Sequence, residues 1–500
     1  MEGKGSDENV CYFCKNLSLK QMGRRKQQRD KSGMRGKVFE RVEISGIAAE
    51  GKAIARVDDK VVFVPFAAPG DVVDVRIKKS RSGYMEGDVV HVHQHGPDRA
   101  EPFCSHFGVC GGCKWQHLPY ERQLATKHQQ VLDSLQRIGK VDLDGVEVLP
   151  IIASEKSTHY RNKLEFTFSN KRWLTADEID TGDPIKEMDG LGFHVPGLFD
   201  KVLDIDTCWL QQEPSNRIRL SVKAFAKQHN IPFYDLRHQS GLLRNLIIRN
   251  NPSGEFMVVV VFAKDEPSQN ESLLNHIAES FPEVVSLAYM INNKKNDSIY
   301  DLEPVIYKGA SYLVEEMDGL RFRVGPKSFF QTNSLQALQL YRVALDFAGL
   351  EGHELVYDLY TGTGTIALFV ARQAGRVIGI EYVEEAVAHA RENAALNGLE
   401  NLQFLAGDMA AILDDLFFQK HGFPHVVITD PPRAGMHPKV IKQLLASNAE
   451  RIVYVSCNPA TQARDIELLS PKYRVTKVQP VDMFPHTHHV ESVVVLSRYP

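Results

Sequence analysis

Hydrophobic and polar residues follow different patterns in successive parts of the chain, and each change of pattern marks an expected domain boundary. Residues 1–33 are polar, show no apolar period and are not expected to fold by themselves. Between residues 34 and 95, short apolar runs such as KVVFVPF and VVDVRI are separated by turn residues. About five short strands in such a segment predict a small β-barrel of the OB type, a common scaffold for RNA.

The remainder of the chain divides into a mixed segment and an α/β segment. Residues 96–320 combine strand-like and helix-like patterns, which predicts a mixed α+β central domain, part of which we expect to pack with the domain that follows. From residue 321 to residue 500, strands such as ELVYDLY and RVIGIE alternate with helical stretches such as EEAVAHARENAALNG. This alternation predicts a parallel, doubly wound α/β sheet.

Composition and charge change this picture only locally. Hydrophobic residues make up 43% of the chain and the net charge is −4, so the average does not indicate a nucleic-acid-binding protein. Basic residues are nevertheless concentrated between Lys20 and Lys37 and in RIKKSR at 76–81, which suits either phosphate contacts or solvated surface. The chain has no long apolar run and no secretory signal at its start, so we expect a cytoplasmic protein without a membrane partner.

Glycines and acids follow successive strands of the α/β segment. After LVYDLY comes TGTGT, in which Gly362 and Gly364 allow a tight turn, although the motif is neither GxGxxG nor a P-loop. Glu381 ends the next strand, where an acid that binds ribose is expected, and Asp408 and Asp430 follow the third and fourth strands. Because parallel strands share one carboxyl edge, this set predicts a pocket for a nucleotide-type cofactor. The set resembles that of a class I S-adenosylmethionine (SAM) methyltransferase.

Cys457 follows the next apolar strand, RIVYVS, and is expected at the same edge. A thiolate that adds to C6 of uracil turns C5 into an enolate carbon able to attack the methyl group of SAM, and a base must then remove the C5 proton. Glu491 opens a run of β-branched residues one strand later and is the candidate base, with the histidines of HTHH as alternatives. A free thiol is mostly protonated at neutral pH, so Cys457 needs an activating group that the sequence does not identify.

The other cysteines suggest a metal site. Cys104, Cys110 and Cys113 lie on one glycine-rich loop, and three thiolates need a fourth ligand to close either a zinc site or a [4Fe–4S] cluster. A radical-SAM methylthiotransferase is the alternative enzyme, but it uses CxxxCxxC, whereas the first spacing here is five residues. Cys11 and Cys14 lie in the polar tail without a second pair nearby, as is typical of an incidental pair.

The motifs DPPRAG, SCNPAT and HHVES, in this order, resemble those of the RNA uracil-5-methyltransferase family, which makes 5-methyluridine in ribosomal or transfer RNA. The resemblance implies that Cys457 is the nucleophile and Glu491 the base. It also implies SAM contacts from the region of the glycine turn at Gly362 and from Gln331, Tyr360, Thr365, Glu381, Asp408 and Asp430. Family members often carry an amide where Thr365 offers a hydroxyl, so this position departs from the family's pattern.

The same resemblance extends to the other segments. CxxxxxCGGCxWQH marks the members with a [4Fe–4S] cluster, in which Cys208 corresponds to the fourth ligand, and residues 34–95 resemble a TRAM domain. Basic residues that could contact RNA are Lys78, Lys79, Arg81 and Arg161, all of which suit ordinary surface positions equally well.

We therefore expect a monomeric, SAM-dependent enzyme that methylates C5 of a specific uridine, in 23S rRNA because cluster and barrel occur together. A tRNA substrate is the nearest alternative. A non-catalytic RNA-binding assembly factor is the alternative from another class, although such a protein has no use for a Cys457/Glu491 pair.

Overall fold

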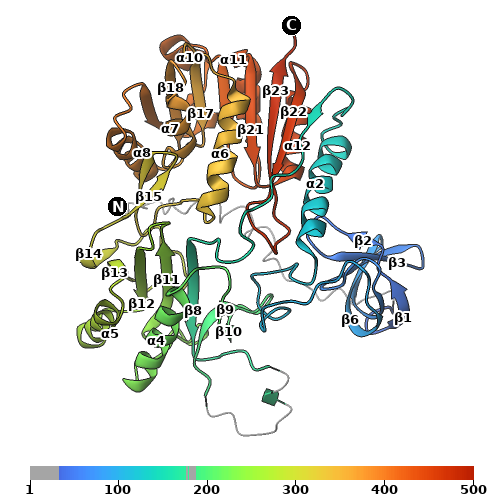
Figure 1. Cartoon of the computed structure of the whole chain (residues 1–500), viewed down its shortest axis with the longest axis vertical. Helices are drawn as coiled ribbons and strands as arrows, with labels where there is room; N and C mark the ends of the chain where they lie inside the picture. Colours follow the sequence, from blue (N-terminus) through green and yellow to red (C-terminus); the bar gives the residue numbers. More distant parts are fainter. Residues whose placement is uncertain (1–32, 176–177, 180–186) are drawn as a thin grey trace, which may run out of the picture. The chain divides into compact units, whose positions relative to one another are not determined.

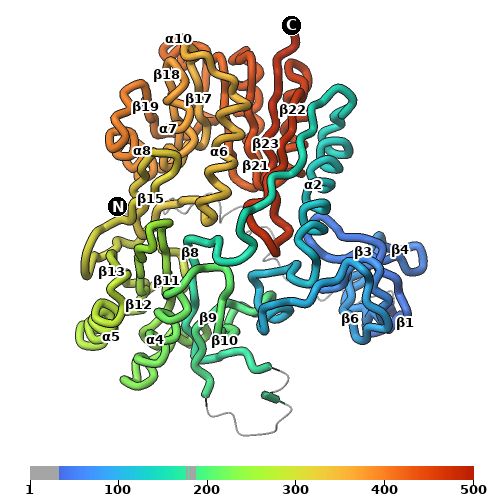
Figure 2. Tube along the Cα trace, viewed as in Figure 1, coloured from blue at the N-terminus to red at the C-terminus, as the bar shows by residue number. Residues whose placement is uncertain are grey.

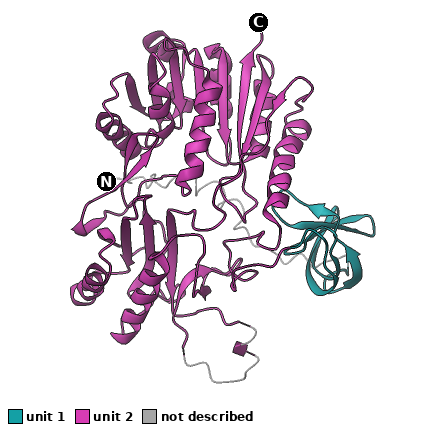
Figure 3. Ribbon diagram, in the orientation of Figure 1, with its two compact units in different colours: residues 1–99 teal, residues 100–500 magenta. Residues whose placement is uncertain are grey.

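The computed structural model describes residues 33–175, 178–179 and 187–500. The predicted N-terminal extension and its Cys11–Cys14 pair lie outside the described residues. The chain divides into two compact units, Met1–Arg99 and Ala100–Pro500 (Figure 3). In the described part of the chain, no helix combines the length and the apolar character that a membrane crossing requires.

The first unit is a six-stranded sheet in the order β1-β5-β6-β4-β3-β2. Its strands are β1 (Val38–Glu43), β2 (Gly46–Ile47), β3 (Ala53–Val57), β4 (Lys60–Val64), β5 (Val72–Ser80) and β6 (Tyr84–Gln94). Alternation along β5 directs Val73, Val75 and Ile77 into the core, where each is almost fully buried. The strand pattern predicted for this segment therefore closes around one small apolar core.

The second unit contains a seven-stranded central sheet in the order β10-β9-β8-β11-β12-β13-β14 (Figure 1). Its strands are β8 (Lys163–Ser169), β9 (Gly190–His194), β10 (Val202–Asp204), β11 (Leu243–Asn250), β12 (Phe256–Phe262), β13 (Val284–Ile291) and β14 (Val305–Gly309). Helices α4 (Ser215–Gln228) and α5 (Pro267–Ser280) pack on one face through their buried aliphatic residues. A two-stranded ribbon, β15 (Leu313–Met317) and β16 (Leu320–Val324), leads from this sheet toward the C-terminal one.

The C-terminal sheet of the same unit has eight strands in the order β19-β18-β17-β20-β21-β23-β22-β7. They are β17 (Leu355–Leu359), β18 (Arg376–Glu381), β19 (Leu402–Ala406), β20 (Val426–Thr429), β21 (Arg451–Ser456), β22 (Tyr473–Val481), β23 (Glu491–Arg498) and β7 (Glu147–Val148). Strands β17 to β21 are parallel, whereas β23 is antiparallel to both β21 and β22. The predicted doubly wound α/β class is confirmed, with an antiparallel β23 added at one side.

Helices cover both faces of this sheet. On one face lie α6 (Ser334–Ala348), α7 (Thr365–Ala371) and α8 (Glu384–Leu396). On the other lie α9 (Met409–Ile412), α10 (Asp415–His421), α11 (Pro438–Ser447) and α12 (Pro459–Leu469). Helix α2 (Tyr120–Arg137), which follows the cysteine loop in sequence, also packs here against α12 and β22 (Figure 2). Residues 120–148, which come early in the chain, are therefore part of the C-terminal α/β sheet and its helix layers.

A buried ion pair anchors α2 to the segment that precedes β23. Lys127 Nζ donates a hydrogen bond to Asp482 Oδ1 at 2.6 Å, and neither side chain is exposed. The hydroxyl of Tyr120 donates to the other oxygen of Asp482 at 2.8 Å. Because a buried charge is stable only when it is paired and hydrogen-bonded, this contact fixes the start of the loop 482–490.

Candidate active site

The glycine turn and Glu381 form the first part of the site, at the carboxyl ends of β17 and β18. Tyr360 follows β17 with a φ of 64°, and Gly364 caps α7 with a φ of 83°. The amide of Gly362 donates to Glu381 Oε2 at 3.1 Å, and the amide of Val383 donates to Glu381 Oε1 at 3.0 Å. Glu381 is therefore held against the turn, beside the amides at the start of α7, as a ribose-binding acid requires.

The other predicted cofactor residues lie around the same edge. Asp408 follows β19 and caps α9 by accepting a hydrogen bond from the amide of Ala410 at 2.9 Å. Thr365 is the first residue of α7, and its side chain hydrogen-bonds to the phenol of Tyr341. Gln331 lies in the loop before α6, where its carbonyl accepts a hydrogen bond from Asn162 Nδ2 at 2.9 Å. The structure thus ties Gln331 to the central sheet by way of Asn162.

Two acids at the carboxyl edge of the sheet, Asp430 and Asp358, are buried among other protein atoms. Burial raises the pKa of Asp430, which follows β20, to about 7. Burial likewise raises the pKa of Asp358, in β17, to about 7, although Thr361 Oγ1 donates to its carboxylate at 2.5 Å. Two carboxyls with raised pKa values at one edge provide a favourable place for a cationic ligand, and the sulfonium and amino groups of SAM are cationic. The sequence signal for Asp358 was an acid inside an apolar strand, and it was overlooked.

Cys457 and Glu491 meet at this edge because of the order of the strands. Cys457 follows β21 directly, and Glu491 is the first residue of β23. The register pairs Ser456 with Ser492, so the antiparallel β23 brings Glu491 to the carboxyl end of β21. The prediction that Glu491 lies on the strand after that of Cys457 is wrong for the order along the chain, because β22 comes between β21 and β23. In the sheet, however, β23 is the neighbour of β21, because β22 pairs with the far side of β23.

Burial and nearby negative charges raise the pKa values of both Cys457 and Glu491. Burial raises the pKa of the half-buried Cys457 thiol to about 12, and the negative charge of Glu491 adds to the shift. Burial, followed by repulsion from Asp430, raises the pKa of Glu491 to about 8. Glu491 is only 5% exposed. A carboxyl with a pKa near 8 is a stronger base than an ordinary glutamate once it is ionised.

Arg433 lies beside Cys457 and opposes, in part, the effect of burial on the pKa of this thiol. Its guanidinium hydrogen-bonds to Cys457, and its charge lowers the pKa values of both Cys457 and Glu491. The Arg433 carbonyl accepts hydrogen bonds from Asn458 Nδ2 and Thr461 Oγ1, each at 3.1 Å, which fixes the DPPRAG loop to the SCNPAT segment. The sequence does contain a sign of this residue. In DPPRAG, an arginine occupies the position where an aromatic residue would indicate methylation of an amine.

The histidines of HTHH are weaker candidates for the base. Burial lowers the pKa of His486 to about 4 and that of His489 to about 3, so both are neutral and poor proton acceptors. The backbone amide of His486 donates to Gln123 Oε1 at 2.8 Å, which directs this residue toward α2. Within the described residues, none of these histidines joins a group of three potential metal ligands.

The four predicted cluster ligands converge in the central part of the second unit. Cys208 is buried, and Cys104, Cys110 and Cys113 are half-buried. Burial, together with the charges of Cys110, Cys208 and Cys104, raises the pKa of Cys113 to about 12, so the four thiols lie near one another. Two thiolates on one zinc ion lie about 4 Å apart or less, given Zn–S bonds of about 2.3 Å. Among the described residues, no three of these sulfur atoms lie within 4.8 Å of one another. Four cysteine thiols are the donor set of a [4Fe–4S] cluster and of a structural zinc site alike.

The basic residues predicted to contact RNA are partly engaged within the protein. In the first unit, Lys78 and Lys79 form ion pairs with Asp88 and Glu86 across the β5–β6 hairpin. In the second unit, the guanidinium of Arg161 lies 5.2 Å from the centre of the Phe484 ring. Both lysines keep 43–67% of their side chains exposed and can still contact phosphate.

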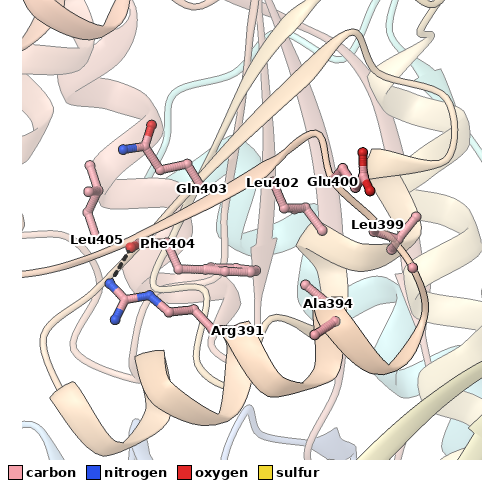
Figure 4. A pocket seen from close by; sticks show the side chains of 10 residues that line it. Arg391, Ala394, Leu399, Glu400, Leu402, Gln403, Phe404 and Leu405 are labelled. Carbon is pink, nitrogen blue, oxygen red and sulfur yellow. Dashed lines mark hydrogen bonds between the residues drawn. The ribbon is translucent and has the colours of Figure 1, made fainter.

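A groove elsewhere on the C-terminal sheet contains none of the predicted residues. It lies between α8 and the edge strand β19 and is lined by both apolar and polar side chains, with Arg391 donating to the carbonyl of Phe404 (Figure 4).

Known proteins resemble this chain over most of its length. The family described as tRNA (Uracil-5-)-methyltransferase matches residues 310–499, and the TRAM domain matches residues 34–90. Two relatives, described as uncharacterized RNA methyltransferases, are each 58% identical. The one from Bacteroides thetaiotaomicron aligns over 90% of this chain and 99% of its own, and the one from Porphyromonas gingivalis over 91% and 99%. The crystal structure of Pyrococcus abyssi tRNA (uracil-54, C5)-methyltransferase with S-adenosyl-L-homocysteine has a TM-score of 0.70. It is 28% identical and covers 91% of this chain and 100% of that one.

Proposed function

This chain belongs to the RNA uracil-5-methyltransferase family and is a SAM-dependent RNA (uracil-C5-)-methyltransferase, and we propose that Cys457 and Glu491 carry out its chemistry on a uridine of 23S rRNA. The observation that carries the proposal is the meeting of Cys457, Arg433 and Glu491 at the edge that also holds Asp430 and Glu381. A nucleophile, a group that lowers its pKa and a base thus lie beside the expected methyl donor.

The proposed reaction assigns one step to each side chain. Arg433 stabilises the Cys457 thiolate, which forms a bond to C6 of the uracil and makes C5 nucleophilic. C5 takes the methyl group from SAM, and S-adenosylhomocysteine leaves. Glu491 removes the C5 proton, the C5–C6 double bond re-forms and the Cys457 thiolate departs. In this proposal SAM is held by Gln331 from the loop before α6 and by six residues that follow or end strands of the C-terminal sheet: Tyr360, Gly362, Thr365, Glu381, Asp408 and Asp430.

The pH dependence of the reaction should follow Glu491 and Arg433. Glu491 must be ionised to act as a base, and its pKa is raised to about 8, so the rate should rise with pH between 7 and 9. Arg433→Gln removes the charge that lowers the pKa values of Cys457 and Glu491. It should therefore move this rise to higher pH by about one unit and reduce the rate at pH 7.5 at least about tenfold. Single-turnover rates across the pH range measure the shift, and Lys439→Gln, which removes an exposed charge on α11, should leave the profile unchanged. An unshifted profile in Arg433→Gln would remove Arg433 from the mechanism.

We further propose that Cys104, Cys110, Cys113 and Cys208 hold a [4Fe–4S] cluster. All four positions are closed by thiolates, so the cluster has no open iron and serves to brace the loop that carries it. Anaerobically purified protein should contain about four iron and four sulfide per chain. Cys208→Ser should lower both contents together, and a stoichiometric zinc content without sulfide would contradict the assignment.

The choice of RNA needs a direct comparison. The joint presence of a TRAM domain and a proposed cluster supports 23S rRNA, whereas the likeness to the Pyrococcus abyssi enzyme favours tRNA. Transcripts of both RNAs, incubated with the protein and methyl-labelled SAM and then digested to nucleosides, should yield 5-methyluridine from 23S rRNA. Label in tRNA alone would make the chain a tRNA methyltransferase with the same chemistry.

A further inference from the structure

A row of four aromatic rings crosses the surface of the second unit beside the cysteine loop. The ring centres of His159 and Trp209 are 5.9 Å apart, those of Trp209 and Phe103 are 6.3 Å apart, and those of Phe103 and His486 are 5.1 Å apart. Trp209 is 40% exposed and Phe103 is 42% exposed, whereas His486 is buried. Large exposed rings in contact with one another are costly in water and indicate a surface that binds a partner.

The backbone holds both ends of this row in place. At one end, the amide of His159 donates to the carbonyl of Trp209 at 2.7 Å. At the other, the amides of Lys114 and Trp115 donate to the carbonyl of His486 at 2.7 and 3.0 Å. His159 and His486 both have a positive φ, of 53° and 63°, a conformation that non-glycine residues keep only where their surroundings enforce it. The rings are therefore presented rigidly.

The row also connects the proposed cluster with the proposed catalytic base. Phe103 directly precedes Cys104, and Trp209 directly follows Cys208, so both exposed rings are neighbours of proposed cluster ligands. His486 begins the short segment that leads into Glu491 at the start of β23. The row therefore links the loop that carries the proposed cluster ligands with the segment that leads into the proposed base.

The surroundings suit an anionic, aromatic ligand. His159, which ends the row, is exposed, and the guanidinium of Arg161, two residues further along the chain, lies on the Phe484 ring at 5.2 Å. Attack at C6 requires that the target uracil leave its stack, which deprives the neighbouring bases of stacking partners. Proteins hold such unstacked bases on exposed aromatic rings that lie beside basic side chains.

Resting on the proposed function, we infer that Phe103 and Trp209 form a stacking platform for unpaired nucleotides next to the target uridine. The cysteines adjacent to the two rings in sequence fix the platform, which gives the proposed cluster a role in binding RNA. The platform acts on bases outside a duplex and does not take part in the transfer of the methyl group.

Binding of two RNA probes tests the platform. The probes are a fluorescein-labelled single strand of about 12 nucleotides and a hairpin duplex of the same length, measured by fluorescence anisotropy. Trp209→Leu and Phe103→Leu keep an apolar side chain but remove the ring, and each should weaken single-strand binding roughly tenfold with little effect on the duplex. Trp209→Phe should restore most of the affinity. The matched control is Phe423→Leu. Phe423 is 53% exposed and precedes β20, so it lies at the amino ends of the parallel strands, opposite the carboxyl ends that the proposed catalytic residues follow.

The outcomes separate this inference from the proposed function. Unchanged single-strand affinity in both leucine variants, or an equal loss for both probes, would overturn the platform. Loss of SAM binding or of iron in the same variants would assign the rings a structural role and overturn it too. If the wild-type protein forms no 5-methyluridine in any RNA, the proposed function fails, whatever the leucine variants bind.

Discussion

Replacing Cys457 with alanine should abolish methylation of RNA while leaving the affinity for SAM nearly unchanged. Without the thiolate, C5 of uracil remains an unreactive vinyl carbon, so turnover should fall by at least about 10⁴-fold, as it does when other enzymes lose a nucleophile. Apart from Gln331, the proposed SAM contacts come from the ends of β17 to β20, whereas Cys457 follows β21. Incorporation of labelled methyl groups measures the first effect, and calorimetric titration with SAM measures the second.

The folded state should tolerate this change. Cys457 is only half-buried, so alanine leaves a small gap at the edge of the sheet and no unpaired buried charge. Cys457→Ser is a closer match in volume and should be almost as inactive, because a hydroxyl forms far less of its anion than a thiol does. Substantial turnover in either variant would exclude the covalent mechanism.

Replacing Glu491 with glutamine should trap the protein on its RNA. Glutamine keeps the shape of the side chain but cannot accept the C5 proton, so the methylated adduct has no route to release. The substitution also removes a negative charge that raises the pKa of Cys457, which favours formation of the thiolate and hence of the adduct. Turnover should fall by at least about 10²-fold while a protein–RNA band stable to denaturing electrophoresis accumulates.

A double variant controls this experiment. Cys457→Ala combined with Glu491→Gln should form no stable band, because the adduct needs the thiol. Release of product from Glu491→Gln at the wild-type rate would transfer the role of base to another group, of which His489 is the nearest candidate in sequence. That outcome would require a base with a pKa lowered to about 3 to replace one raised to about 8.

The sequence predicted the site residues best where a rule of topology applied. Parallel strands share one carboxyl edge, so residues that follow apolar runs, such as Asp430 and Cys457, could be placed together without coordinates. The family motifs added the roles of these residues. The confirmed α/β class follows from the same alternation of strands and helices.

Long-range contacts could not be predicted in this way. The hairpin that places β23 between β21 and β22 was missed, because TKVQPV is a polar, proline-containing strand with little signal. Nothing in YERQLATKHQQVLDSLQR indicates that Lys127 pairs with Asp482, which is more than 350 residues away in the chain. The pKa shifts of Asp358 and Cys457 could not be predicted, because they depend on burial and on charges that the fold brings near, which a local pattern does not contain.

The central claim is that the Cys457 sulfur forms a bond to C6 of a uridine that is methylated at C5. RNA in which 5-fluorouridine replaces uridine tests it directly, because Glu491 cannot remove fluorine and the methylated adduct cannot be released. Mass spectrometry after digestion with trypsin and nuclease should find the peptide with Cys457 carrying a methylated fluorouridine nucleotide, and only when SAM was present. An unmodified Cys457 peptide beside normal methylation of unsubstituted RNA, or an adduct on another cysteine, would contradict the account.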